Sequence, residues 1–306
     1  MNIVITGATS FIGSNVLNEL IKNQENKIWV VIRPNSKNID RLPVHKNIII
    51  VKLDMFEIEG LVNFIDEPVD VFYHFAWDGV RAPLRDDAEI QNANYSATMK
   101  AMEVCYKLHG CKFIGCGSQA EYGSMDGRID ENYPCKPNTE YGKAKLNAYL
   151  SLNEYALKHD IEFIWARIFS VYGLGDYAGS LVMTCIDKMS KNETLEFTEC
   201  KQEWDYIYID EVAEIFLKFA TVKCENGIYN IASGKHRRLK EYVQTIKKLM
   251  DSGSILEFGK IPYPASGVVS FVPNINKLKN ELKWESQVSF EEGIKIILQG
   301  KANEEN

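Results

Sequence analysis

The chain has 306 residues, 45% of them hydrophobic and 25% charged, so it is long enough to bury a large core as one or two domains. Its net charge of -7 provides no basic field to attract nucleic acid or an anionic membrane, and no apolar run reaches the roughly 20 residues of a membrane-spanning helix. Seven cysteines without a C-x-x-C pair indicate reduced thiols, and the first residues resemble no secretory signal. We therefore expect a cytoplasmic protein whose ligands bind at a local site.

Short apolar runs alternate with helical patterns through the first 170 residues. Six runs predict strands: "NIVIT", "KIWVVIR", "NIIIVKL", "VDVFYHFA", "CKFIGCG" and "IEFIWARIF". After the first run, Ile12, Val16 and Leu20 recur at helical spacing. Continuous apolar runs are typical of parallel strands that helices cover on both faces. The pattern predicts an α/β fold with a doubly wound parallel sheet, the Rossmann architecture.

The pattern loosens after residue 172, where "YGLGDYAGS" reads as a turn-rich loop and "GIYNIASG" as a further strand. We expect residues 1–172 to form a first domain. Residues 173–306 should form mainly a smaller, substrate-binding lobe, with parts of about 204–232 returning to the main sheet.

The segment "VITGATSFIGSNV" joins the first predicted strand to the first predicted helix. Gly7, Ser10 and Gly13 occupy the three positions of a G-x-x-G-x-x-G turn. Small residues let the backbone approach a pyrophosphate, and the helix N-terminus offers free N–H groups. A tight connection without a ligand is the alternative, but the position at the start of a βαβ series favours dinucleotide binding by the first domain.

The second predicted strand ends in "VVIRPNSKN", which places Arg33, Ser36 and Lys37 where NAD-binding proteins normally have an acidic residue. A guanidinium pairs well with a ribose 2′-phosphate, which a carboxylate would repel. The sequence therefore favours NADP(H), with NAD(H) as the alternative. The competing interpretation is an exposed arginine that only keeps the loop soluble.

Three polar side chains form a candidate catalytic set. "NTEYGKAKLNAYL" places Tyr141 and Lys145 four residues apart, on one face of a helix. A neighbouring cation helps a tyrosine to exchange a proton near neutral pH. Ser118 ends the fifth predicted strand, and the carboxyl ends of parallel strands face the ligand crevice, so its hydroxyl can bond a substrate oxygen. A surface pair and a turn cap are the alternatives for these residues.

Together these segments resemble the extended short-chain dehydrogenase/reductase family, the NAD(P)-dependent epimerase/dehydratase group that acts on sugar nucleotides. The resemblance covers nearly the whole chain, through "TGATSFIG", "YHFAW", "NANYSATM", "GSQAEYG", "YGKAK", "ARIFSVYG", "WDYIYIDEVA" and "GIYNIASG". Ser10 and Asn274 depart from the family pattern. Family members often form dimers through paired helices, so the resemblance also implies a homodimer.

By this resemblance, Tyr141 is the general acid/base, Lys145 holds the nicotinamide ribose and lowers the pKa of the tyrosine, and Ser118 orients the reacting oxygen. It places Asp54 and Met55 by the adenine and Asn94 near the active-site helix. Phe75, Ala76 and Trp77 are expected along the cofactor. The expected cofactor contacts are Gly7, Ser10, Phe11, Ile12, Gly13, Arg33, Ser36, Asp54, Met55, Phe75, Ala76, Trp77, Asn94, Tyr141 and Lys145.

The residues after Ser118 bear on the reaction. Sugar-nucleotide 4,6-dehydratases of the family carry an Asp-Glu pair there, whereas this chain has Gln119 and Ala120, which disfavours dehydration. Glu121 follows one position later and is not expected to act. Arg33 favours NADPH-dependent reduction of the carbon-4 ketone of a nucleotide-diphosphate-linked 4-keto-6-deoxyhexose.

A 4-epimerase is the alternative reaction. A non-catalytic NADP-sensing protein is the other class, and it is disfavoured because such proteins usually lose the tyrosine or the lysine. No metal site is expected, because the histidines lack ligand spacing. The expected substrate contacts are Ser118, Gln119, Tyr141 and Arg237, with Arg238 as a second phosphate candidate; a solvated surface position is the alternative for both arginines.

Overall fold

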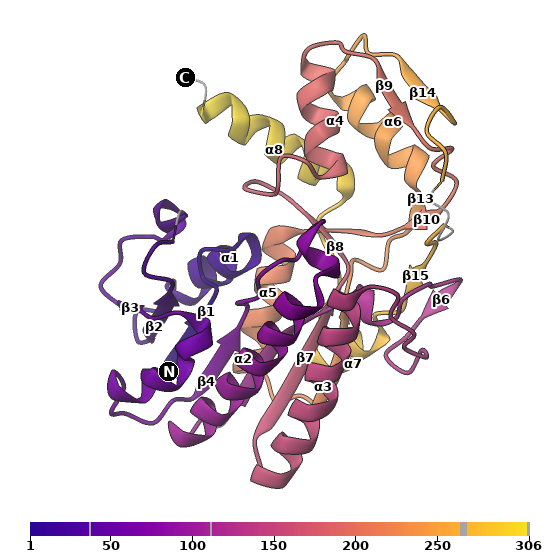
Figure 1. Cartoon of the computed structure of the whole chain (residues 1–306). Coiled ribbons are helices and arrows are strands. Elements are labelled where there is room, and N and C mark those ends of the chain that lie inside the picture. Colours follow the sequence, from indigo (N-terminus) through magenta and orange to yellow (C-terminus); the bar gives the residue numbers. More distant parts are fainter. Residues whose placement is uncertain (37, 111, 264–267, 305–306) are drawn as a thin grey trace.

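A seven-stranded parallel sheet forms the centre of the molecule (Figure 1). The computed structural model describes residues 1–36, 38–110, 112–263 and 268–304. In spatial order, the strands are β12 (Gly227–Ile231), β7 (Glu162–Ile168), β5 (Lys112–Ser118), β4 (Val71–His74), β1 (Asn2–Thr6), β2 (Lys27–Ile32) and β3 (Ile48–Lys52). The strand order reverses between β1 and β4, where such sheets bind ligands. The predicted α/β Rossmann fold is confirmed.

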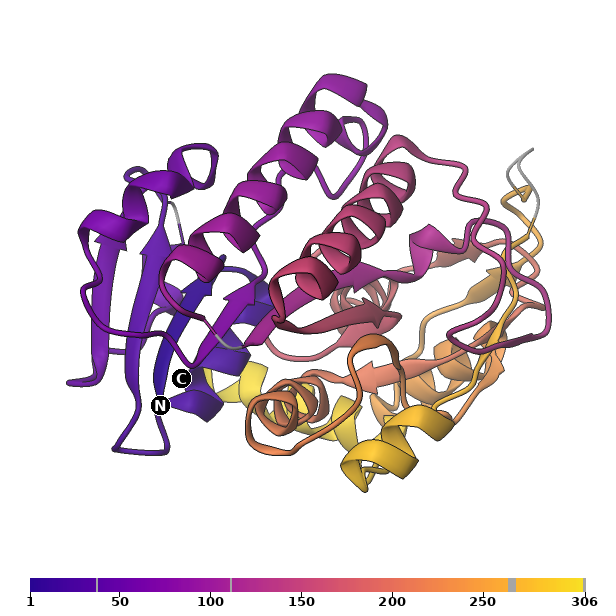
Figure 2. The same cartoon turned by 90° about the horizontal axis from the view of Figure 1, so that it is seen from below.

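Helices cover both faces of the sheet (Figures 1 and 2). Helices α1 (Phe11–Leu20) and α5 (Ile209–Thr221) pack together on one face, and α2 (Ala88–Lys107) and α3 (Glu140–His159) on the other. Within β1, Ile3 and Ile5 join the core of α1 and α5, whereas Val4 joins that of α2 and α3. Alternate side chains of a strand point to opposite faces, so two-sided burial explains the continuous apolar runs.

Several elements that follow β7 in the chain form a lobe of short helices and strands with its own apolar core. Its helices are α4 (Leu181–Ser190), α6 (Leu239–Leu249) and α8 (Phe290–Glu304). Its paired strands are β8 (Ser170–Tyr172) with β11 (Tyr206–Tyr208), β9 (Leu195–Phe197) with β14 (Leu256–Phe258), and β10 (Glu203–Trp204) with β13 (Arg237–Arg238). We call these elements the lobe, and the main sheet with α1, α2, α3 and α5 the sheet half. The boundary at residue 172 stays a prediction.

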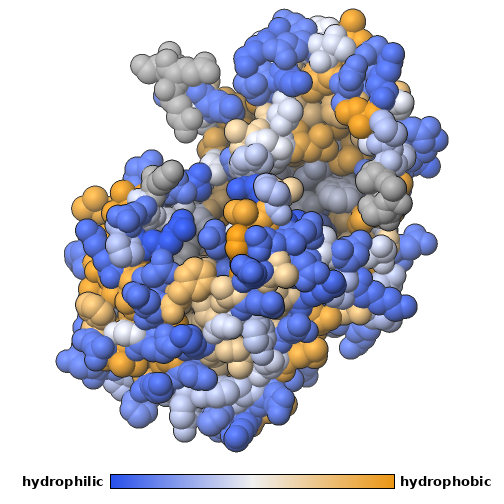
Figure 3. Space-filling view, viewed as in Figure 1, coloured by the Kyte–Doolittle hydropathy of each residue, from blue (hydrophilic) through white to orange (hydrophobic). Residues whose placement is uncertain are grey.

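The remaining elements are η1 (Ile39–Arg41), η2 (Met55–Asn63), η3 (Leu84–Asp86), η4 (Gln119–Glu121), α7 (Asn276–Leu282), and the pair β6 (Arg128–Ile129) and β15 (Val272–Pro273). Figure 3 shows the surface hollowed between the lobe at the top and the sheet half below. Of the helices in the described part of the chain, none is both long and apolar enough to cross a bilayer.

Candidate active site and cofactor cleft

Where β1 leads into α1, two positions leave no space for any side chain larger than that of glycine. Gly7 has φ +70°, and a Cβ there would lie 2.6 Å from the backbone nitrogen of Ala76. A Cβ on Gly13 would lie 2.3 Å from the carbonyl oxygen of Gly7. Ser10 caps α1, because its Oγ accepts a hydrogen bond from the Gly13 N–H at 3.1 Å. The turn therefore brings bare backbone and a helix N-terminus to the carboxyl edge of the sheet.

A cavity of about 590 Å³ runs along this edge, across the point where the strand order reverses. Its lining includes most of the predicted site residues. They are Gly7, Ser10, Phe11, Ile12, Arg33, Ser36, Met55, Phe75, Ala76, Trp77, Ser118, Tyr141 and Lys145. A cleft of this size beside a helix N-terminus suits a dinucleotide.

A second cavity, of about 700 Å³, lies at the end of β2 and shares Arg33 and Ser36 with the first. Asp54 also lines it, and its Oδ1 accepts a hydrogen bond from the Phe56 N–H at 3.0 Å, which caps η2. Lys37, the third predicted residue of this loop, lies outside the described residues. The cavity at the end of β2 is thus lined by the guanidinium of Arg33 and by the hydroxyl groups of Thr9 and Ser36.

Asn94 does not line either cavity. It is buried in α2, where its amide accepts from the Asp78 N–H at 2.9 Å and donates to the Asp78 carbonyl at 2.8 Å. Gln91, one turn earlier, accepts from Nε1 of Trp77 at 2.9 Å. This helix therefore holds the loop that follows β4, including the tryptophan that faces the cleft.

Ser118, Tyr141 and Lys145 come together at the inner end of the cleft. Ser118 is the last residue of β5, and α3 carries the other two. Ser118 and Tyr141 both line the cleft, and the Ser118 hydroxyl is near enough to the phenol to act on its pKa. Lys145 donates from Nζ to the carbonyl oxygen of Cys116 at 2.6 Å, and its Nζ lies 3.6 Å from the ring centroid of Trp77 and 5.8 Å from that of Tyr141.

Burial dominates the titration of both helix residues. It raises the pKa of the Tyr141 hydroxyl above its usual range, although the Ser118 hydroxyl and the Arg85 guanidinium, 4.5 Å from the ring centroid, oppose the rise. Burial lowers the pKa of Lys145 to about 8. The expected lowering of the tyrosine pKa by Lys145 stays a prediction. At neutral pH, the site holds a protonated phenol next to an ammonium group.

Gln119 directly follows the serine in η4. Its Oε1 is buried and, among the described residues, has no hydrogen-bond partner. A buried acceptor without a partner costs free energy, which a ligand hydroxyl would recover. Gln119 is not among the residues that line the cleft, so its predicted role in substrate binding stays a prediction.

Arg237 lies in the lobe, where β13 positions it. Its guanidinium pairs with both carboxylate oxygens of Glu291, at 2.7 and 3.1 Å, and lies 4.5 Å from the ring centroid of Tyr242. Arg238, the next residue, is exposed. A phosphate at Arg237 would therefore compete with a carboxylate that already occupies the guanidinium.

The loop of residues 173–180 also reaches the cleft, which sequence reasoning missed. Arg41 donates to the carbonyl oxygen of Gly175 at 3.2 Å, and the Arg81 guanidinium lies 4.0 Å from the ring centroid of Tyr177. All four residues line the cavity. The sequence carried no signal for these contacts beyond the turn-rich composition of "YGLGDYAGS", because they join loops that are distant along the chain.

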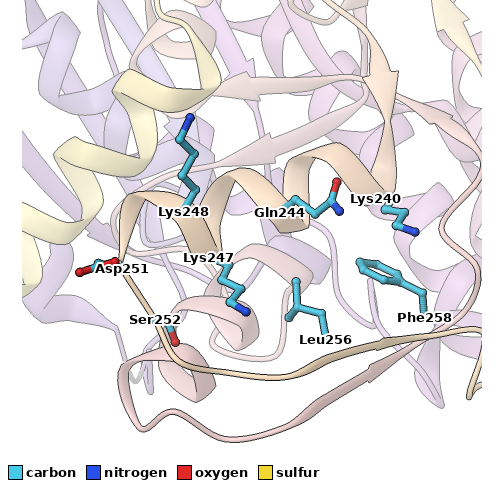
Figure 4. A pocket seen from close by; sticks show the side chains of 8 residues that line it. All are labelled: Lys240, Gln244, Lys247, Lys248, Asp251, Ser252, Leu256 and Phe258. Atoms are coloured by element: carbon cyan, nitrogen blue, oxygen red, sulfur yellow. The ribbon is translucent and has the colours of Figure 1, made fainter.

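A separate groove of about 560 Å³ lies on the lobe between α6 and β14 (Figure 4). Lys240, Lys247 and Lys248 border it together with Leu256 and Phe258. It contains none of the predicted site residues. Across the part of the chain that the structure describes, no three metal-ligating side chains lie together.

The sequence pattern of the NAD dependent epimerase/dehydratase family matches residues 3–232, about three quarters of the chain. The chain belongs to this family. The sequence is 29% identical over 304 residues to CDP-abequose synthase of Salmonella muenchen, with 98% of this chain and 97% of that protein covered. It is also 29% identical over 312 residues to an Arabidopsis thaliana trifunctional enzyme whose activities include UDP-4-keto-L-rhamnose reductase, with 96% of this chain and 46% of that enzyme covered.

Solved structures share the fold across the whole chain. UDP-N-acetylglucosamine 4-epimerase of Methanobrevibacter ruminantium superposes with a TM-score of 0.88 at 21% identity, covering 99% of this chain and 98% of that one. The NAD complex of dTDP-glucose 4,6-dehydratase from Bacillus anthracis gives 0.86 at 23%, covering 100% and 98%. The names of these similar proteins include a synthase, a reductase, an epimerase and a dehydratase, so proteins of this fold catalyse different reactions.

Proposed function

We propose that the protein reduces the carbon-4 ketone of a nucleotide-diphosphate-linked 4-keto-6-deoxyhexose with NADPH. The observation that carries the proposal is the buried phenol of Tyr141, whose raised pKa keeps it protonated, next to Ser118 in a cleft that Arg33 also lines. Gln119 and Ala120 follow the serine, so no acid pair is present there to expel water. The similarity to CDP-abequose synthase supports a deoxysugar substrate.

The residues of the cleft fit a nicotinamide dinucleotide. Gly7 and Gly13 leave no room for a side chain where the pyrophosphate would approach the turn, and Arg33 and Ser36 border both cavities where the adenosine ribose would lie. The reduced nicotinamide, when bound, supplies the hydride for carbon 4. NAD(H) is the alternative cofactor, because the solved relative from Bacillus anthracis was determined with NAD.

Tyr141 holds a proton at its phenol oxygen, because burial raises its pKa. It is therefore suited to protonate the oxygen on carbon 4 as negative charge develops there. Ser118 donates a hydrogen bond to the same oxygen, and the ammonium group of Lys145 holds the ribose hydroxyls next to the nicotinamide. Gln119, whose Oε1 has no partner among the described residues, is the candidate acceptor for a sugar hydroxyl.

A 4-epimerase is the second candidate, and the fold shared with solved 4-epimerases favours it. An epimerase regenerates its own cofactor and needs no NADPH supply. A non-catalytic NADP sensor is a third candidate, although the chain keeps the serine, tyrosine and lysine together. We also propose that the protein forms a homodimer.

The test mixes the protein with NADPH and a panel of CDP-, dTDP-, UDP- and GDP-linked 4-keto-6-deoxyhexoses and follows the loss of NADPH absorbance. We expect oxidation with at least one of them. No turnover with any of them, together with conversion of an intact hexose nucleotide to its carbon-4 epimer without added cofactor, would establish the epimerase instead. Tight NADPH binding without either reaction would favour the sensor.

A further inference from the structure

The carboxylate of Glu121 lies behind the strand that ends in Ser118. Its side chain is 0% exposed and accepts three hydrogen bonds. Oε1 accepts from the backbone N–H of Ser118 at 2.8 Å and from Nε1 of Trp165 at 2.9 Å, and Oε2 accepts from Nε of Arg167 at 2.7 Å. Glu121 does not line the cleft, so it reaches a ligand only through other residues.

These bonds fix the backbone of Ser118. The serine Oγ accepts from the Ala120 N–H at 3.2 Å while Glu121 accepts from the serine N–H, so the two side chains form a capping box around one tight turn. β5 is also packed closely on Trp165. A Cβ on Gly117 would lie 2.4 Å from the indole nitrogen, and one on Gly115 would lie 2.6 Å from the indole ring.

The same strand holds Lys145. Cys116 lies between the two glycines, and its carbonyl oxygen accepts the hydrogen bond from the lysine ammonium. Two ionisable groups act on the pKa of Lys145, Cys116 on β5 and Glu121 on η4, and Lys145 in turn acts on that of His74 on β4. The rings of Trp77, Trp165 and Tyr141 face the ammonium group. Glu121 is the group among these that carries a carboxylate. Burial lowers the pKa of Lys145, and Cys116 and then the charge of Glu121 raise it.

We propose that Glu121 is a positioning residue of the active site: its carboxylate fixes Ser118 and stabilises the ammonium group of Lys145 from behind β5, with Arg167 as its buried counter-ion. This inference rests on the proposed function only in assigning Ser118 and Lys145 to the reaction. The contacts themselves are independent of the substrate.

The first experiment measures the dissociation constant of NADPH against pH, which needs no turnover. Lys145 loses its proton near pH 8, so binding should weaken as the pH rises through that value, and Lys145→Met should abolish the inflection. Glu121→Gln keeps the shape of the side chain and removes its charge. We expect it to move the inflection about one pH unit lower, because a nearby anion no longer favours the ammonium form.

Trp165→Phe is the matched control, because it removes one hydrogen bond to Glu121 and leaves the charge in place. It should lower the melting temperature without moving the inflection. The proposal would be overturned if Glu121→Gln did not move the inflection, or if both variants moved it equally. It would also be overturned if the Lys145→Met protein kept the inflection of the wild type. If Glu121→Gln fails to fold, Glu121→Gln/Arg167→Gln leaves no lone buried charge and should move the inflection in the same direction by less.

The second experiment measures reduction at about pH 5.5, more than one pH unit below the expected inflection of either protein, where Lys145 stays protonated in each. Glu121→Gln should then lower kcat about tenfold through the misplaced serine, with the KM for NADPH unchanged. An unchanged kcat would overturn the part of the proposal that concerns Ser118. If no ketone is reduced by the wild type while the binding inflection still moves, the proposed function fails and the link between Glu121 and Lys145 stands.

Discussion

An arginine–glutamate pair lies in each half of the molecule, and the two differ in exposure. In the sheet half, the Arg167 and Glu121 side chains are 2% and 0% exposed. In the lobe, the Arg237 and Glu291 side chains are 27% and 42% exposed. Removing one partner of a buried pair costs about 3–5 kcal/mol, whereas an exposed pair contributes about 0–1 kcal/mol. Arg167 is therefore held in its pair with Glu121, whereas Arg237 can leave Glu291 and bind another anion.

The backbone around the two pairs differs in the same way. Glu121 and Arg167 lie on or next to β5 and β7, which pair in parallel over seven residues. Arg237 lies on β13, a two-residue strand that pairs with the two-residue strand β10. We propose that chemistry depends on the sheet half, where the backbone is held on both sides, and that substrate recognition depends on the lobe. Each prediction below tests one side of this division.

Tyr141→Phe should have the largest effect. Loss of the phenol proton donor should lower kcat by about 10²–10⁴-fold, because the ring keeps its packing and only the acid is lost. NADPH binding should stay within about twofold, since the substitution removes one hydroxyl at one end of a long ligand. Steady-state kinetics and cofactor titration measure the two quantities. Undiminished turnover would show that the proton comes from elsewhere.

Arg33→Ser should change the cofactor preference of the sheet half. The loss of a charge-assisted bond to the 2′-phosphate should lower the preference for NADPH over NADH by roughly 10–100-fold in kcat/KM. Arg238→Ser is the matched control, because it removes an exposed arginine from the lobe. A preference for NADH in the wild type would contradict the assignment of NADPH.

Arg237→Gln should act on the lobe alone. If a diphosphate takes the place of Glu291, the KM for the sugar nucleotide should rise about tenfold while the affinity for NADPH stays the same. The melting temperature should change little, since the pair is partly exposed. Lys248→Gln serves as the control, because it removes an exposed cation of the lobe that does not line the cleft. An unchanged KM would leave Arg237 as a structural partner of Glu291.

Arg81→Ala should have the smallest effect and tests the contact between the halves. Loss of the cation–π contact with Tyr177 should raise the dissociation rate of NADPH about 2–5-fold, because that loop borders the cofactor cleft. Stopped-flow displacement measures the rate. A change in the KM for the sugar nucleotide alone would instead assign this loop to substrate binding.

Much of the sheet half was predictable because its signals are local. The strand runs, the glycine turn and the Tyr141–Lys145 pair each lie within about 13 consecutive residues, where hydrophobic period and helical spacing determine geometry directly. Glu121 was harder. Sequence reasoning expected that it would not act, but gave no reason to pair it with Arg167, which lies 46 residues further along the chain.

The lobe was less predictable for the same physical reason. Its strands are two or three residues long, too short to show a period, and their partners come from distant segments. Arg237 was chosen as a candidate by its charge, and its bond to Glu291 spans 54 residues. The contacts of Arg41 and Arg81 with residues 173–180 likewise depend on how the two halves meet.

The sequence by itself determined the parallel sheet, the glycine turn and the spacing of the candidate catalytic residues, because backbone sterics and apolar periodicity act over a few residues. Only the tertiary structure decided which groups are buried. Burial decided that Tyr141 keeps its proton, that the pKa of Lys145 falls to about 8, and that Glu121 is fully engaged behind the strand. The cost of removing a charge from water depends on every neighbour that surrounds it, and those neighbours are assembled by the fold.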